Sequence, residues 1–167
     1  ERRGDRFMKS GNSVGLPPFL CQEKAGVNMG LMGGQFMAAS LVAENRMRGV
    51  PASIQSIPTT GDFQDHVSFG LLAARKGHVI LRNTAYILAF EAICAAQAVD
   101  IREGSHKLSP AGKVVYDAVR SLVPYFKYNE LYMDNMEALA ELIRSGELVK
   151  QVERVLPENL MLVEGIE

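Results

Sequence analysis

The residues with the clearest potential for chemistry stand together in the segment 56–70, which reads SIPTTGDFQDHVSFG. Gln64, Asp65 and His66 follow one another there. A carboxamide both donates and accepts hydrogen bonds, a carboxylate accepts them, and an imidazole exchanges a proton near neutral pH. The segment therefore holds groups able to bind a polar substrate, although the same three residues could equally form the cap and solvated surface of a helix.

Histidine and cysteine spacing elsewhere in the chain disfavours a metal or nucleophilic centre. His66 and His78 stand twelve residues apart, too far along one helix to share a metal ion, and His106 lies farther on. Cys21 and Cys94 show no CxxC spacing, which predicts two reduced, apolar thiols in an intracellular protein. The HExxH and GxSxG motifs are absent, so we expect neither a bound metal nor a serine hydrolase.

The overall composition is typical of a globular protein. The chain has 167 residues, of which 47% are hydrophobic and 22% charged, and its net charge of −1 gives no electrostatic reason to bind nucleic acid or an anionic membrane. Its charged first residues are not followed by the apolar core of a signal peptide. The most apolar run, Thr84–Val99, is too short for a bilayer and carries Glu91 and Gln97. We therefore expect a cytoplasmic protein.

The polar segment is expected to begin a long helix between Gly61 and Gly104. Asp62 or Asp65 would cap its first turn, where free backbone N–H groups favour a carboxylate or an anionic ligand. About forty residues at 1.5 Å each would span roughly 60 Å, the length of a strut in a helical bundle. Its expected inner face has apolar residues every three or four positions: Val67, Leu71, Ala74, Leu81, Ala85, Leu88, Ala92, Ala96 and Val99.

The second half of this helix is apolar on nearly every side, in the runs Ala85–Phe90 and Ala92–Ala96. A helix that is apolar all round is buried all round. Because one chain of this size offers little cover, we expect other chains or further sequence to surround it.

A shorter helix is predicted before the long one. Asn28 is a candidate cap for a helix ending near Arg48. Gly30, Gly33 and Gly34 in its first turns predict close approach of another helix or a ligand, because each glycine weakens a helix. A phosphate-binding loop is the disfavoured alternative, since no Gly-Lys-Ser/Thr follows.

Three further helices are predicted after the long one. Ser109-Pro110 has the form of a helix start, Asp134–Glu137 has the form of a capping box, and Glu147–Leu156 completes the series. No strand alternation or internal repeat is present. The predicted fold class is all-α, with bundle helices and the Gln64 junction in residues 1–104 and a helical tail in residues 105–167.

Eight short segments stand in a characteristic order along the chain. They are Glu1–Arg3, Leu16–Leu20, Gly26–Asn28, Ala43–Asn45, Pro51–Ser53, Ser56–Thr59, Gln64–Ser68 and Ala95–Arg102. Together they resemble the histidine ammonia-lyase family. The similarity covers most of the chain to about Glu103 and, more loosely, the helical tail.

The resemblance implies a fold, a cofactor and an assembly. Members of the family are all-helical homotetramers with the fumarase/aspartase-like bundle, and they eliminate ammonia from an aromatic amino acid. Their electrophile, 4-methylidene-imidazol-5-one (MIO), forms from an internal Ala-Ser-Gly that the family places upstream and that these residues lack. The chain would then be the C-terminal third of a larger enzyme, inactive alone, that assembles through its long helices and binds a small amino acid substrate.

One active-site position of the family falls in this chain, and it is Gln64. Histidine-specific members usually have glutamate there, whereas phenylalanine and tyrosine enzymes commonly have glutamine. Because the continuation Asp65-His66-Val67-Ser68 matches histidine lyases, the resemblance favours histidine as substrate and urocanate as product. Asp65 and His66 are expected to cap the helix or to support Gln64.

Two alternatives to a histidine ammonia-lyase stay open. The first is a tyrosine or phenylalanine ammonia-lyase, or a related aminomutase, which glutamine at position 64 favours. The second is a helical assembly module without catalytic activity. An Ala-Ser-Gly in preceding sequence would separate an enzyme from such a module.

Overall fold

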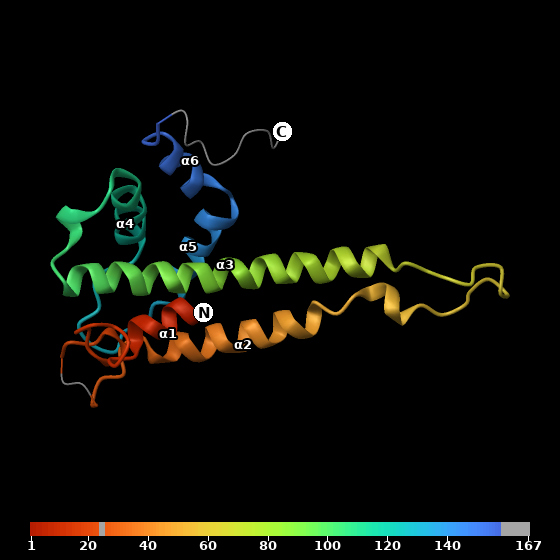
Figure 1. Ribbon diagram of the computed structural model, residues 1–167, viewed down its shortest axis with the longest axis horizontal. Helices are drawn as coiled ribbons and strands as arrows, with labels where there is room; N and C mark the ends of the chain where they lie inside the picture. Colours follow the sequence, from red (N-terminus) through yellow and green to blue (C-terminus); the bar gives the residue numbers. More distant parts are fainter. Residues whose placement is uncertain (24–25, 158–167) are drawn as a thin grey trace.

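A computed structural model describes residues 1–23 and 26–157, in which a long two-helix arm extends from a cluster of shorter helices (Figure 1). The helices are α1 (Arg2–Met8), α2 (Met32–Arg48), α3 (Gly70–Ile101), α4 (Pro110–Leu122), α5 (Met133–Arg144) and α6 (Glu147–Glu153), with 3-10 turns η1 (Pro18–Leu20), η2 (Ala52–Gln55) and η3 (Ser105–Lys107). The described residues form no β-strand, and an isolated bridge joins Thr59 and Gln64. The predicted all-α class is confirmed.

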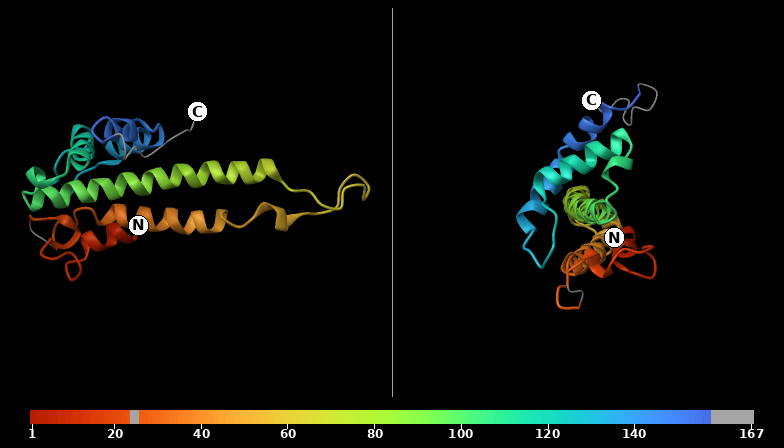
Figure 2. Two further views of the ribbon diagram at one scale, coloured as in Figure 1. Left: turned by 45° about the horizontal axis from the view of Figure 1, so that its top comes forward. Right: turned by 90° about the vertical axis from the view of Figure 1, so that its left-hand side faces the viewer.

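The arm consists of α2 and α3, which run antiparallel and side by side in both views (Figures 1 and 2). At its far end the segment 49–69 connects them and forms the tip of the arm. At its base, α1 and η1 pack against α3 on the side of α2, while α4 and α5 cover the other side of α3. This arrangement places the polar segment far from the cluster of shorter helices.

The long helix begins later in the chain than the sequence predicted. α3 has 32 residues, which is about 48 Å, and begins at Gly70. The residue before it, Phe69, has a left-handed backbone (φ 51°), and no side chain among the described residues caps the first turn. The prediction that Asp62 or Asp65 caps this helix is therefore wrong.

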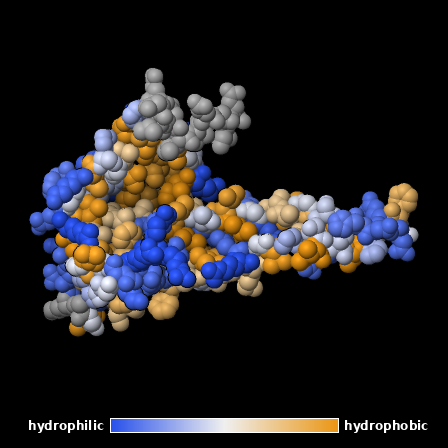
Figure 3. Space-filling model, in the orientation of Figure 1, coloured by the Kyte–Doolittle hydropathy of each residue, from blue (hydrophilic) through white to orange (hydrophobic). Residues whose placement is uncertain are grey.

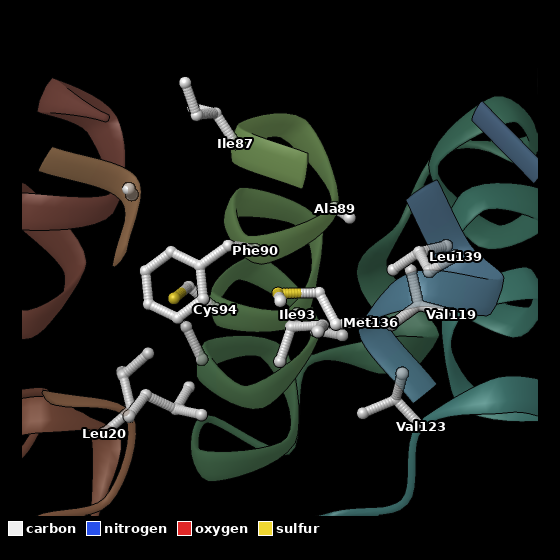
Figure 4. Close-up of a cluster of buried hydrophobic side chains, with 14 of the residues drawn as sticks. Leu20, Ile87, Ala89, Phe90, Ile93, Cys94, Val119, Val123, Met136 and Leu139 are labelled. Carbon is white, nitrogen blue, oxygen red and sulfur yellow. The ribbon is translucent and has the colours of Figure 1, made fainter. Parts of the chain in front are cut away.

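The hydrophobic core surrounds the C-terminal half of α3. Figure 4 shows Phe90 and Leu20 on the side of the N-terminal segments and Met136 and Leu139 on the side of the C-terminal helices. Ile93 lies between them and is fully buried. The chain's own helices therefore cover much of the apolar stretch that was expected to need other chains.

Both cysteines belong to this buried region. Cys21 and Cys94 are free thiols, as predicted. Burial raises the pKa of the Cys94 thiol far above its ordinary value, so the thiolate that reacts with oxidants and metals does not form there.

By length and composition alone, α3 is apolar enough to cross a membrane. The prediction that the apolar run is too short for a bilayer therefore does not hold for the whole helix. Core helices of soluble proteins have the same property, and 44% of the most apolar window of α3 is buried within this chain.

Of the side-chain caps predicted at Asn28, Ser109 and Asp134, the structure confirms one, and the predicted start of the last helix at Glu147 is also confirmed. Ser109 accepts a hydrogen bond from the backbone N–H of Gly112 at 3.2 Å and caps α4. Asn28 lies outside α2 and donates to the carbonyl of Glu23 instead. The capping box at Asp134 does not form, because α5 already begins at Met133 without a side-chain cap.

Two glycines, Gly34 in α2 and Gly30 just before it, permit close approach of neighbouring segments. A Cβ atom on Gly34 would lie 2.0 Å from Cε2 of Phe90, whose ring is buried, so only glycine fits. A Cβ on Gly30 would lie 2.6 Å from the carbonyl oxygen of Phe19. The predicted close approach is thus confirmed at these two positions, and Gly33 has nothing within 4 Å.

We expect Gly34→Ala to lower the free energy of unfolding by about 1–3 kcal/mol, because the packed ring of Phe90 must move. Gly33→Ala is the matched control: its new methyl group meets open space, and alanine favours the helix by up to about 1 kcal/mol. Denaturant unfolding of both variants and the parent measures the difference. Equal stability of the two variants would contradict the close contact.

Candidate functional site

Gln64 lies in a tight hairpin at the tip of the arm. The backbone N–H of Thr59 donates to the carbonyl of Gln64 (3.0 Å), and the N–H of Gln64 donates to the carbonyl of Thr59 (3.3 Å). The hydroxyl of Thr59 also donates to Oε1 of the Gln64 side chain at 3.3 Å. The carboxamide is therefore held by its oxygen, and its N–H groups have no partner within the described residues.

Left-handed residues make the turn between these two positions. Thr60, Gly61 and Asp62 have φ values of 53°, 62° and 65°, which reverses the chain within a few residues. The next residue, Phe63, is 88% exposed, so an aromatic ring stands unprotected beside Gln64. The sequence analysis did not single out Phe63 or Thr59, since neither forms a catalytic motif.

The base of the loop is closed by one side chain. The hydroxyl of Ser56 accepts a hydrogen bond from the backbone N–H of Val67 at 2.8 Å. This bond joins the outgoing and returning segments of the loop nearer to the helices than the Thr59–Gln64 pair. The loop is therefore closed by hydrogen bonds at two places, Ser56–Val67 and Thr59–Gln64.

Asp65 and His66 are exposed and follow Gln64 toward α3. They lie before the helix rather than in its first turn, so their expected capping role is wrong. Within the described residues neither side chain makes a hydrogen bond, including to Gln64. Their expected support of Gln64 stays a prediction.

A polar groove lies elsewhere, between α3 and α5. It has a volume of about 380 Å³ and is lined by His78, Arg82, Tyr86 and Glu137 among others. No residue of the loop contributes to it. The structure therefore separates His78 from His66, and within residues 1–23 and 26–157 no cluster of three or more His, Cys, Asp or Glu side chains could hold a metal ion.

The arm exposes many large apolar side chains. In Figure 3 apolar and polar patches alternate along it up to the tip. The exposed residues of the arm and its loop are Phe36, Met47, Val50, Ile54, Ile57, Phe63, Leu71, Leu72 and Leu81. Such a surface is typical of one that other protein covers.

The tip has binding groups but no complete reaction centre. A carboxamide can orient or polarise a substrate, but it is neither a general base nor a nucleophile at neutral pH. The fold and the loop thus define a helical protein that presents a polar binding group on a long arm, where another surface can complete the site.

Comparison with known proteins identifies the family. Residues 1–121 match the family model for aromatic amino acid lyases. The chain belongs to the aromatic amino acid lyase family, and the resemblance inferred from the sequence is confirmed.

Curated relatives differ in their reactions. Histidine ammonia-lyase 1 of Fusobacterium nucleatum is 41% identical over 156 residues, and tyrosine ammonia-lyase of Cupriavidus metallidurans is 43% identical over 152 residues. The matches cover 93% and 91% of this chain but 30% and 28% of those proteins. The chain therefore spans about 30% of the length of the relatives it matches.

Solved structures of the family share the fold. The phenylalanine aminomutase of Pantoea agglomerans is 54% identical with a TM-score of 0.81, over 86% of this chain and 28% of that one. The tyrosine aminomutase of Streptomyces globisporus is 44% identical with a TM-score of 0.87, over 92% of this chain and 29% of that one. The expected ammonia-lyase fold is confirmed.

The apolar surface of the arm leads to a prediction about assembly. We expect residues 1–167, produced alone, to self-associate, because the large apolar side chains of the arm have no cover in the single chain. Sedimentation velocity at micromolar concentration measures this. A stable monomer with a cooperative thermal transition would contradict it.

Proposed function

We propose that the full-length protein containing this chain is an ammonia-lyase or aminomutase that acts on an aromatic amino acid. The family membership and the named reactions of the relatives support this proposal. The structural observation that carries it is the carboxamide of Gln64, held by Thr59 at an exposed tip beside the exposed ring of Phe63. Such a group suits a site completed by another part of the enzyme, in a homotetramer joined through the long helices.

The chemistry of elimination must come from residues outside this chain. One relative is named an MIO-dependent tyrosine 2,3-aminomutase, and an MIO group supplies an electrophile for the substrate's amino group. The 167 residues contain no Ala-Ser-Gly, so they do not supply that group, and we assign this chain no step on it. The proposed role of Gln64 is to bind and orient the substrate.

The hydrogen bond from Thr59 occupies one end of the Gln64 amide. Its oxygen accepts from the Thr59 hydroxyl, which leaves the N–H₂ group available as a donor. A donor suits a substrate carboxylate or a phenol oxygen, whereas glutamate would suit a cationic or N–H group. The neighbouring ring of Phe63 offers an apolar contact for a phenyl or phenol ring.

We therefore propose phenylalanine or tyrosine as the substrate class. The 54% identity with a phenylalanine aminomutase supports this choice. Histidine, favoured by the sequence interpretation, is the second candidate, and the histidine ammonia-lyase relatives together with Asp65-His66-Val67-Ser68 support it.

Removal of the amide tests the role of Gln64. We expect Gln64→Ala in the full-length enzyme to lower turnover at least tenfold without loss of helix content, because substrate orientation is lost while the hairpin backbone bonds remain. Steady-state kinetics and circular dichroism measure these effects. His66→Ala is the control, with a smaller expected change.

Turnover of Gln64→Ala within about threefold of the parent, a change of under roughly 1 kcal/mol in the barrier, would show that Gln64 is not in the active site.

Substrate choice is tested with each amino acid separately. We expect cinnamate or coumarate, followed by ultraviolet absorption, or a β-amino acid, followed by chromatography, from phenylalanine or tyrosine. Gln64→Glu should shift preference toward histidine, because a carboxylate accepts from an imidazole N–H. Urocanate as the main product of the parent would establish the second candidate, and no product from any aromatic amino acid would favour a non-catalytic module.

A further inference from the structure

A buried carboxamide lies midway along the arm, on α3. Asn83 is only 3% exposed, and it is the first buried residue of α3, since none of the residues from Gly70 to Arg82 is buried. On the facing helix, the buried residues of α2 are Gly34 and Ala38, near the base of the arm. Asn83 therefore marks the outer limit of the buried contact between the two helices.

Both hydrogens of the Asn83 amide are used across the interface. Nδ2 donates to Oε2 of Glu44 at 2.9 Å and to Oδ1 of Asn45 at 3.0 Å. A reversed amide would place its oxygen against Glu44 Oε2, which can only accept. The side chain therefore recognises one pair of neighbouring positions on α2.

Each of the two partners of Asn83 makes a further hydrogen bond. Asn45 donates through Nδ2 to the hydroxyl of Thr84 (3.5 Å), which donates to the carbonyl of Ile80 (2.7 Å). Glu44 accepts from Nε of Arg48 at 2.8 Å, at the last residue of α2. The hydrogen bonds from Arg48 and then Asn83 lower the pKa of the Glu44 carboxyl, which keeps it an acceptor at neutral pH.

This network specifies register where apolar packing does not. Beyond Ala38 the apolar residues of α2 that face the core, Leu41 and Val42, are only half-buried, and such contacts tolerate sliding of one helix along another. Asn83 is buried while its partners Glu44 and Asn45 are half-buried, and its paired donors favour a single register, as a lone asparagine does in a coiled coil. A slip by one helical turn would move the loop anchors by about 5.4 Å.

We propose that Asn83 is a positioning residue for Gln64. By pairing with Glu44 and Asn45 it sets the register of α2 against α3, and thereby the place and orientation of the loop that both helices hold. This proposal rests on the proposed function, in which Gln64 orients the substrate. Displacement of an orienting group by about 1 Å can lower a rate by about a hundredfold.

The first test is kinetic and uses the full-length enzyme. Asn83→Leu keeps the branched shape and removes both donors, so we expect kcat to fall at least tenfold while KM stays within about threefold. If Asn83 acts through Gln64, adding Gln64→Ala lowers kcat less in the Asn83→Leu background than in the parent. If the fold-reductions in kcat of the two substitutions simply multiply, Asn83 has a merely structural role and the proposal is overturned.

A buried amide on the same helix provides the matched control. Gln97 is fully buried and donates to the carbonyls of Leu20 (3.3 Å) and Phe126 (2.7 Å), at the opposite end of α3. Gln97→Leu removes a comparable network at the end of α3 opposite the loop. We expect it to lower the melting temperature but to leave kcat of the folded enzyme within about threefold and uncoupled from Gln64.

A rescue variant guards against a failure of Asn83→Leu to fold. Asn83→Asp keeps the shape but sets a carboxylate against Glu44, so kcat should fall. Adding Glu44→Gln restores a donor–acceptor pair, and kcat of this double variant should be at least threefold higher than kcat of Asn83→Asp alone. No recovery, with both variants folded, would overturn the proposal.

Hydrogen–deuterium exchange gives a readout that does not depend on activity. The amides of Thr59 and Gln64 bond to each other's carbonyls, so their exchange reports the order of the hairpin. Asn83→Leu should speed exchange in segment 56–69 at least tenfold, whereas Gln97→Leu should not. Unchanged exchange in Asn83→Leu would overturn the proposal whether or not the parent enzyme is active. A parent enzyme without activity would count against the proposed function but not against the role of Asn83 in ordering the loop.

Discussion

The contact between α2 and α3 is the constraint on which the rest of this structure depends. At the base, Gly34 lets the Phe90 ring pack where any side chain would clash. Farther out, apolar burial gives way to the hydrogen bonds of Asn83. Beyond Asn83 no residue of α3 is buried, and there η2, with its buried Ala52, contacts α3.

The hairpin at the tip is ordered by local bonds rather than by packing. Thr59 and Gln64 exchange backbone hydrogen bonds, and the Thr59 hydroxyl donates to the oxygen of the Gln64 amide. Because the ring of Phe63 and large apolar side chains along the arm are exposed, the arm is suited to contact with another protein surface. A binding group on a rigid arm can thus belong to a site that its own chain does not enclose.

The features that could be predicted from the sequence are those set by short-range interactions along the chain. The cap at Ser109 and the all-α class follow from short-range preferences, and the eight ordered segments were enough to indicate the family. The start of α3 was misplaced, since no proline or run of glycines signals that Thr60, Gly61 and Asp62 all adopt left-handed backbones. The polar pair of Asn83 and Glu44 could not be predicted, because it joins residues far apart in the chain.

The central claim is that the Gln64 amide, carried on the α2–α3 arm, contacts the substrate in a site completed by other parts of the enzyme. A crystal structure of the full-length protein with bound cinnamate or coumarate tests it most directly. The account predicts Nε2 of Gln64 within about 3.5 Å of a polar atom of the ligand or of the reacting group. A loop that faces solvent, with the ligand bound and no contact to Gln64, would contradict it.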